Sequence, residues 1–312
     1  MNRPVVLVTG ATGFVGRNLV PLLDSSGFRV RRALREGRAG KDDVVVGSVG
    51  PSTDWGAALE GVHSVIHLAA RVHHPNEENA GGLYDAVNMQ GTMQLAQAAE
   101  RAGVSKFVFL STILVNGSST DGRGPFKADD TMVPRGVYGK SKAAAENALR
   151  RIGAQSKMQI AVVRPPLVYG REALGNFRQL VGTIRQRIPL PLGLVDNKRA
   201  FISVQNLVSF VAHLVDFELG PAYQVYLVAD DEQISTAAFV RRIGKAMDKP
   251  VILLPVPPSA LALVLRVIRP ELRHSLLGSM EVDTSAALST GWRPPLSMTE
   301  GLRLAVGTSA SS

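Results

Sequence analysis

The chain of 312 residues contains no cysteine, which excludes disulfides and thiolate metal sites. Aromatic residues make up only 5% of it, and the Arg and Lys residues behind its net charge of +9 are scattered without an RNA- or DNA-binding motif. We therefore expect no nucleic-acid partner. An anionic small substrate or a position close to a membrane accounts for the charge equally well.

Long apolar runs are also missing. The longest, residues 253–268, is interrupted by three prolines and Arg266, whereas a membrane-spanning helix needs about 20 mostly apolar residues. The first four residues lead straight into a strand-like segment and do not form a signal peptide. We expect a cytoplasmic protein without a membrane span, and an apolar content of 45% is ordinary for a globular protein.

A metal-ligand pattern is lacking too. His67 falls within a strand pattern, and His73 and His74 fall in a polar loop, with no carboxylate at metal-ligand spacing. We expect core or loop histidines here and no metal.

Alternating strand and helix patterns over the first part of the chain predict an α/β fold, a doubly wound parallel sheet of the Rossmann-like kind. We expect strands at 5–8, 29–35, 44–46, 64–68, 106–110 and 160–163, and helical stretches at 55–59, 83–102 and 138–149. The pattern is less regular afterwards. We predict a dinucleotide-binding domain at 1–168, a smaller C-terminal substrate-binding lobe at 169–306 whose elements can cross back to the first domain, and a disordered tail at 307–312.

The turn after the first strand carries glycines at positions 10, 13 and 16. Glycines there let the backbone turn tightly and approach a pyrophosphate, and the N-terminus of the following helix offers free N–H groups. A Gly-rich turn without a ligand is the simpler alternative, but its place between a strand and a helix favours dinucleotide binding. The predicted cofactor contacts are Gly10, Thr12, Gly13, Phe14, Val15 and Gly16.

The second strand pattern, 29–35, ends where an acidic residue would bond the ribose of NAD. The pattern has no acid at that position, and Arg31, Arg32 and Arg35 suit a 2′-phosphate instead. This favours NADP(H) and leaves NAD(H) open.

Tyr138 and Lys142 are four residues apart at the start of a helical run, so their side chains share one face. A nearby ammonium favours a phenolate, which makes the pair a candidate acid/base device. Ser111 and Thr112 follow the fifth strand, at the sheet edge where ligands of open α/β sheets bind. The alternatives are an ordinary solvated helix face and strand-end capping.

With the motifs at 8–16, 67–70, 88–92, 111–112, 138–142, 164–170 and 199–204 in this order, the chain resembles the extended short-chain dehydrogenases/reductases. More narrowly, it resembles the NAD-dependent epimerase/dehydratase family that acts on nucleotide sugars. The resemblance implies that Tyr138 is the catalytic acid/base, that Lys142 holds the nicotinamide ribose and lowers the Tyr138 pKa, and that Thr112 bonds the reacting oxygen.

The same resemblance implies further contacts and partners. Cofactor contacts would come from Arg35, Leu68, Ala69, Ala70, Asn88, Ser111 and Pro165, besides Tyr138 and Lys142. Contacts to a UDP-sugar substrate would come from Thr112, Asn176, Phe177 and Arg199. The family resemblance also implies a homodimer formed through a helix pair.

Four departures from the family pattern leave the reaction open. No Asp follows the third strand at 47–49, Asn116 stands where many relatives have Tyr, Pro166 where epimerases often have Asn, and Gln205 where Asp is common. We expect reduction of the C4 ketone of a UDP-4-keto-6-deoxy-N-acetylhexosamine, in the synthesis of O-antigen or other polysaccharide precursors. The alternatives are a UDP-glucose or UDP-GlcNAc 4-epimerase with tightly bound NAD, and an NAD(P)-sensing protein without chemistry.

Overall fold

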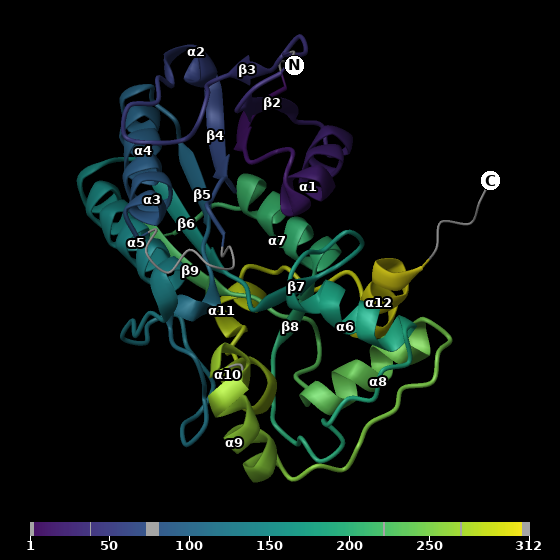
Figure 1. Cartoon of the computed structure of the whole chain (residues 1–312). Helices are drawn as coiled ribbons and strands as arrows, with labels where there is room; N and C mark the ends of the chain where they lie inside the picture. The colour runs from purple at the N-terminus through teal and green to yellow at the C-terminus, as the bar shows by residue number, and fades with distance from the viewer. Residues whose placement is uncertain (1–2, 38, 73–80, 221, 269, 308–312) are drawn as a thin grey trace, which may run out of the picture.

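The computed structural model describes residues 3–37, 39–72, 81–220, 222–268 and 270–307. Its centre is a seven-stranded parallel sheet with the order β3-β2-β1-β4-β5-β6-β9, flanked by helices (Figure 1). The strands are β1 (Val5–Thr9), β2 (Arg29–Leu34), β3 (Val44–Val45), β4 (Val62–His67), β5 (Lys106–Leu110), β6 (Gln159–Arg164) and β9 (Tyr223–Leu227). The predicted doubly wound, Rossmann-like sheet is confirmed.

Successive strand side chains enter two different helical layers, as the period of two in a strand requires. Val6 and Val8 of β1 belong to one buried cluster with α1 (Phe14–Ser25) and α7 (Val204–Asp216). Leu7 belongs to the opposite cluster, with α4 (Gly91–Arg101) and α5 (Gly136–Gln155). Figure 1 shows α1 and α7 on one side of the sheet and α4 and α5 on the other.

The helical stretch expected at 83–102 is divided into three parts. It consists of α3 (Gly81–Tyr84), the π-helical turn η1 (Asp85–Gln90) and α4. Such turns insert one extra residue and are frequent at functional sites. The remaining elements of this half are α2 (Gly56–Leu59) and the 3₁₀ turn η2 (Ile113–Val115), which follows β5.

The second lobe begins with a separate two-stranded parallel sheet, β7 (Leu167–Tyr169) and β8 (Phe201–Ser203). Its helices are α6 (Asn176–Arg185), α8 (Thr236–Ala246), α9 (Pro258–Ile268), α10 (Pro270–Leu277) and α12 (Met298–Val306), whereas α11 (Ser285–Ser289) packs with the α1 and α7 cluster of the large sheet. Between these, α7 and β9 return to the large sheet, where β9 pairs with β6. The two halves are therefore interleaved along the chain.

A hydrogen bond ties this second lobe to the segment after β9: Tyr169 Oη donates to Asp230 Oδ2 at 2.6 Å. Among the described helices, none combines the length and the apolar character needed to cross a bilayer. The tail predicted at 307–312 lies outside the described residues from 308 onward.

Candidate active site

The turn between β1 and α1 has the backbone geometry that a dinucleotide needs. Gly10 has φ +68°, and a Cβ there would lie 2.7 Å from the backbone nitrogen of Ala69, so only glycine fits. Gly13 is the N-cap of α1 and provides no side-chain cap, which leaves the first amides of this helix free for an anion. Thr12 lies in this turn, and Phe14 and Val15 are the first two residues of α1. These residues fit the pyrophosphate of a nicotinamide dinucleotide.

The end of β4 is held beside this turn by a buried chain of hydrogen bonds. Thr9 Oγ1 lies 2.7 Å from His67 Nδ1, and His67 Nε2 lies 2.9 Å from Thr92 Oγ1. Burial, with the nearby Lys142 charge, lowers the pKa of His67 to about 3, so its ring is neutral. His67 is a core histidine, as expected. His73 and His74 lie outside the described residues, and no metal-type cluster occurs among the described ones.

The segment after β4 is joined to the catalytic helix through Asn88. Ala69 N–H donates to Thr9 Oγ1 at 3.2 Å, so Leu68, Ala69 and Ala70 follow the Gly10 turn closely. Asn88 Oδ1 accepts from Arg71 N–H at 2.8 Å, and its amide nitrogen lies 2.9 Å from both Arg71 O and Ser141 Oγ. With both ends of its amide engaged, Asn88 positions the cofactor-side loop against α5.

Two of the three arginines predicted to bind a 2′-phosphate are engaged elsewhere. Arg31 donates to the backbone carbonyls of Ala58 and Glu60, at 3.0 and 2.7 Å. Arg32 forms a forked ion pair with Asp43, at 2.8 and 2.5 Å. These bonds hold β2 to its neighbouring segments, so neither side chain is available to a cofactor in this arrangement.

Arg35 is exposed just beyond the end of β2, and so is Glu36, which pairs with it at 3.2 Å. β2 ends at Leu34, so Arg35 follows the strand directly and Glu36 comes one residue later. The strand is one residue shorter than the predicted 29–35, and both side chains lie beyond its carboxyl end. A contact of Arg35 with the 2′-phosphate of NADP stays a prediction.

Tyr138 and Lys142 lie on one face of the first turns of α5. Burial raises the pKa of Tyr138 to about 12, with a smaller contribution from Tyr84. Lys142 is 1% exposed; its Nζ donates to Leu110 O at 2.8 Å and lies 4.3 Å from the centre of the Phe109 ring. Burial lowers the pKa of Lys142 to about 7, against the opposing charge of Glu146.

The expected lowering of the Tyr138 pKa by Lys142 is not seen in this arrangement. The Lys142 ammonium donates to the Leu110 carbonyl, and the loss of hydration around Tyr138, with a smaller effect of Tyr84, raises the Tyr138 pKa. Tyr138 is therefore a neutral phenol at pH 7, able to donate a proton.

Thr112 lies at the carboxyl end of β5, next to the turn that carries Tyr138. Its Oγ1 accepts from Leu114 N–H at 3.3 Å, so its own hydroxyl hydrogen can be donated outward. The α5 turn packs closely here, since a Cβ on Gly139 would lie 3.1 Å from Leu114 O. Pro165 supports η2, the turn that follows Thr112, through its carbonyl, which accepts from Ile113 N–H at 2.9 Å.

Behind these groups lies a buried ionic network that sequence reasoning missed. Ser111 Oγ donates to Glu146 Oε1 at 2.5 Å, and Arg164 donates to both oxygens of Glu146. Arg164 also donates to Asn116 Oδ1 at 2.9 Å, and Asn116 donates to Lys127 O. Ser111 thus faces this network. The signal in the sequence was the spacing of Glu146, four residues after Lys142.

The substrate-side predictions have different outcomes in the second lobe. Asn176 is exposed at the first position of α6, which has no side-chain cap. Phe177 is 3% exposed, with its ring centre 5.6 Å from that of Tyr169 and 6.4 Å from that of Phe239. The predicted substrate contact by the Phe177 side chain does not agree with this placement, because the ring is part of the lobe's aromatic core.

Arg199 is also buried. Its Nη1 donates to His274 O at 3.0 Å and to Gly278 O at 2.6 Å, and burial lowers its pKa to about 10. It joins the strand region before β8 to the end of α10. Any contact of Arg199 with a diphosphate stays a prediction.

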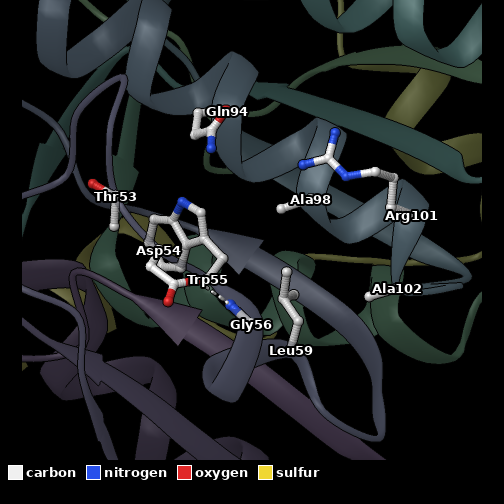
Figure 2. Close-up of a pocket in the computed structure, with 9 residues that line it drawn as sticks. All are labelled: Thr53, Asp54, Trp55, Gly56, Leu59, Gln94, Ala98, Arg101 and Ala102. Atoms are coloured by element: carbon white, nitrogen blue, oxygen red, sulfur yellow. Dashed lines mark hydrogen bonds between the residues drawn. The ribbon is translucent and has the colours of Figure 1, made fainter.

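A separate pocket of about 310 Å³ lies between α2 and α4 (Figure 2). Its lining includes Trp55, Leu59, Gln94 and Arg101, and none of the predicted site residues. Figure 2 shows the indole nitrogen of Trp55 on the side that faces Gln94. This pocket is distinct from the candidate active site.

The chain is similar to several known proteins. A family model described as "NAD dependent epimerase/dehydratase family" matches residues 6–229. The chain is 38% identical over 307 residues to a UDP-glucose 4-epimerase of Vibrio cholerae, covering 96% of this chain and 93% of that protein. It is 28% identical to an N-acetyl-alpha-D-glucosaminyl-diphospho-ditrans,octacis-undecaprenol 4-epimerase of Escherichia coli O157:H7, covering 82% and 77%.

Among solved structures, the chain is similar to MoeE5 in complex with UDP-glucuronic acid and NAD. The TM-score is 0.78 with 23% sequence identity, over 96% of this chain and 97% of that one. This likeness shows a shared fold.

Proposed function

The chain belongs to the NAD dependent epimerase/dehydratase family, and on that premise we propose that it reduces the C4 ketone of a UDP-4-keto-6-deoxy-N-acetylhexosamine. The observation that carries the proposal is the grouping of Tyr138, Lys142 and Thr112 at the carboxyl end of β5, on the same edge of the sheet as the Gly10 turn.

Tyr138 is the proton donor in this proposal. Its raised pKa, about 12, keeps the phenol protonated at neutral pH, which suits the reduction of a ketone. The proton of Tyr138 Oη passes to the C4 oxygen as that oxygen gains negative charge. Positioned proton transfer of this kind contributes about 10² to 10⁴-fold to a rate.

Thr112 and Lys142 assist from two sides. The Thr112 hydroxyl donates a hydrogen bond to the same C4 oxygen. The Lys142 ammonium, which donates to the Leu110 carbonyl in this structure, would turn toward Tyr138 to stabilise the phenolate left behind. Glu146 in turn favours the charged form of Lys142.

A reduced nicotinamide dinucleotide, when bound, supplies the hydride that reaches C4. The free amides at the start of α1 would hold its pyrophosphate, and Arg35 would pair with the 2′-phosphate of NADPH, which we favour. NADH is the alternative, with Glu36 on the ribose.

The nucleotide part of the substrate is supported by the comparisons. The Vibrio cholerae relative carries UDP-glucose in its name, and the MoeE5 structure contains UDP-glucuronic acid. We propose that Asn176 and the backbone at the start of α6 contact the diphosphate, with Arg199 as a further candidate. We also propose that the reaction serves the synthesis of polysaccharide precursors. We further propose that the protein is a homodimer, which light scattering of the purified chain tests.

A 4-epimerase is the second candidate, because both named relatives are 4-epimerases. An epimerase oxidises the C4 hydroxyl before reducing it, so Tyr138 would first have to accept a proton. That step needs the phenolate, and burial, which raises the pKa of Tyr138 to about 12, disfavours the phenolate.

The test is to incubate the protein with the 4-keto sugar nucleotide and NADPH or NADH. We expect one cofactor molecule oxidised for each ketone consumed. If neither cofactor is oxidised with any 4-keto sugar nucleotide, the reductase proposal fails. Interconversion of UDP-GlcNAc and UDP-GalNAc, or of UDP-glucose and UDP-galactose, without added cofactor would assign an epimerase. Failure of both assays with intact cofactor binding would favour a sensing role.

A further inference from the structure

Helix α9 presents a continuous apolar stripe to solvent. Leu263, Val264, Val267 and Ile268 are 67, 50, 81 and 68% exposed, and their spacing places them along one side of the helix. The opposite side packs into the lobe, where Leu265 is 9% exposed. Single exposed apolar residues are ordinary, but a contiguous stripe marks an interaction surface.

More apolar side chains are exposed on the chain that leads into α9. Ile252 and Leu254 there are 45 and 43% exposed, and Ile188 and Leu194 on the adjoining segment are 48 and 50% exposed. Backbone hydrogen bonds join the two segments, including Gly193 N–H to Leu254 O at 2.9 Å. In Figure 1 the segment before α9 and α9 itself run along the lower edge of the molecule.

We call this set of side chains the apolar face. It comprises Ile188, Leu194, Ile252, Leu254, Leu263, Val264, Val267 and Ile268. These are eight of the 14 large apolar side chains that are exposed among the described residues. The concentration in one part of one lobe sets this surface apart from the rest of the molecule.

The sequence around the apolar face is strongly basic. Residues 185–198 and 249–274 contain seven Arg and Lys residues and two acidic residues, Asp196 and Glu271. These segments, one eighth of the chain, therefore carry +5 of its net charge of +9. Arg185, Arg187 and Arg266 are exposed close to the apolar side chains in sequence. Apolar side chains flanked by cations match an anionic phospholipid surface.

A second copy of the chain is a poorer occupant. A twofold contact sets the same patch against itself, which would bring two basic surfaces together. Like charges facing one another across an interface are unfavourable. A lipid surface instead offers acyl chains to the apolar side chains and phosphates to the arginines.

We propose that the apolar face docks on the surface of an anionic phospholipid bilayer, with α9 lying in the plane of the interface. α9 has 11 residues and is about 17 Å long at 1.5 Å per residue, well short of a hydrocarbon core of about 30 Å. Its opposite side, with the buried Leu261 and Leu265, stays packed on the lobe, so the contact is peripheral.

This surface is connected to the candidate substrate site. The carbonyls of His274, in the α10 helix that follows α9, and of Gly278 accept hydrogen bonds from Arg199. Ser279 O accepts from Thr120 N–H at 2.8 Å, in the segment that follows η2 and Thr112. Docking through α9 therefore holds the substrate-binding lobe at the membrane surface.

The experiment is flotation of the full-length protein with vesicles of phosphatidylglycerol and, in parallel, of phosphatidylcholine. We expect binding to the first and little to the second, and loss of binding at high salt. The double variant Leu263→Gln/Val267→Gln should bind phosphatidylglycerol at least about tenfold more weakly. Arg266→Gln should bind about fivefold more weakly, with a shallower salt dependence.

The matched control is Leu304→Gln, which alters an apolar side chain of α12 that is 52% exposed and lies outside the apolar face. It should bind as the unaltered protein does. Absence of vesicle binding, or equal binding by the double variant, overturns the proposal. A dimer that the double variant dissociates, without vesicle binding, assigns the face to a subunit contact and also overturns it. Vesicle binding requires no substrate, so it is independent of the proposed reaction.

Discussion

Glu146 and Arg164 form a fully buried ion pair, with Arg164 Nη2 2.5 Å from Glu146 Oε2 and both side chains at most 1% exposed. The pair connects α5 to the end of β6, directly behind the candidate catalytic residues. Lys142 lies one turn before Glu146 on the same helix face. The ion pair therefore fixes the position of Lys142 relative to the end of β5, where its Nζ donates to the Leu110 carbonyl.

Glu146→Gln should be strongly destabilising, because it leaves the buried Arg164 guanidinium without a compensating charge. We expect the free energy of unfolding to fall by about 3 to 5 kcal/mol, measured by urea denaturation. Glu100→Gln, at an exposed position of α4, is the control and should change it by less than about 0.5 kcal/mol. Replacing both partners, as Glu146→Leu with Arg164→Met, should recover part of the loss.

Tyr138→Phe should lower kcat by about 10² to 10⁴-fold, because it removes the proton donor while keeping the ring. Cofactor affinity, measured by fluorescence titration, should change little. Parallel loss of cofactor binding and activity would instead mean that the hydroxyl has a packing role.

Lys142→Met should separate stability from activity. The pKa of Lys142 is about 7 in the folded chain and about 10.4 in an unfolded one. Between these values the unfolded state binds more protons, so Lys142 makes stability rise with pH over this range. The variant should lose this rise. At pH 7 its melting temperature should equal that of the parent or exceed it by about 2 °C or more. Its turnover should be lost.

Thermal unfolding at several pH values measures this effect. Lys140→Met, at an exposed position two residues earlier on α5, is the control and should keep the pH dependence. A Lys142→Met variant that melts well below the parent at pH 7 would contradict the inferred cost of burying the ammonium.

Gly10→Ala should lower the free energy of unfolding by more than backbone strain alone would. Gly10 and Gly61 have nearly the same φ, +68° and +67°, but a Cβ on Gly61 meets nothing within 4 Å, whereas one on Gly10 meets the backbone of Ala69. Gly61→Ala should lower the free energy of unfolding by about 1 to 2 kcal/mol. Gly10→Ala should lower it further and weaken cofactor binding. If urea denaturation gave equal decreases in the free energy of unfolding for the two variants, the loop after β4 would be able to move away from the added methyl group without a cost in stability.

Arg35 and Glu36 should control cofactor choice in opposite directions. Arg35→Ala should raise KM for NADPH by about tenfold, the effect of losing one charge-assisted bond, with little change for NADH. Glu36→Ala should affect NADH alone. Steady-state kinetics with both cofactors measures this, and an unchanged preference in both variants would place the discriminating group elsewhere.

Much of the sheet follows from local patterns. The β-branched runs at β1 and β6 and the glycines after β1 determine strand positions and a turn that tolerates no side chain, because both depend on neighbouring residues only. Tyr138 and Lys142 could be paired for the same reason: a helix places i and i+4 together wherever it packs.

Other features depend on contacts between distant segments. Arg199 was expected at a diphosphate, but carbonyls some 75 residues away accept its hydrogen bonds. Arg31 and Arg32 were expected to pair with a 2′-phosphate. The packing of β2 instead brings Ala58, Glu60 and Asp43 to them as hydrogen-bond partners. The Ser111 hydroxyl turns to Glu146 because α5 covers β5 and β6. No local spacing encodes these partners.

The return of β9 to the large sheet limits how this chain can be recombined. A chimera that takes residues 169–306 from a relative, to change the sugar that is accepted, would also replace the strand that pairs with β6 and the α7 helix that covers it. The β9 strand of the relative would then have to pair with β6 of this chain along five residue pairs. Specificity should therefore be transplanted as two inserts on either side of residues 203–227, with that stretch kept from the parent.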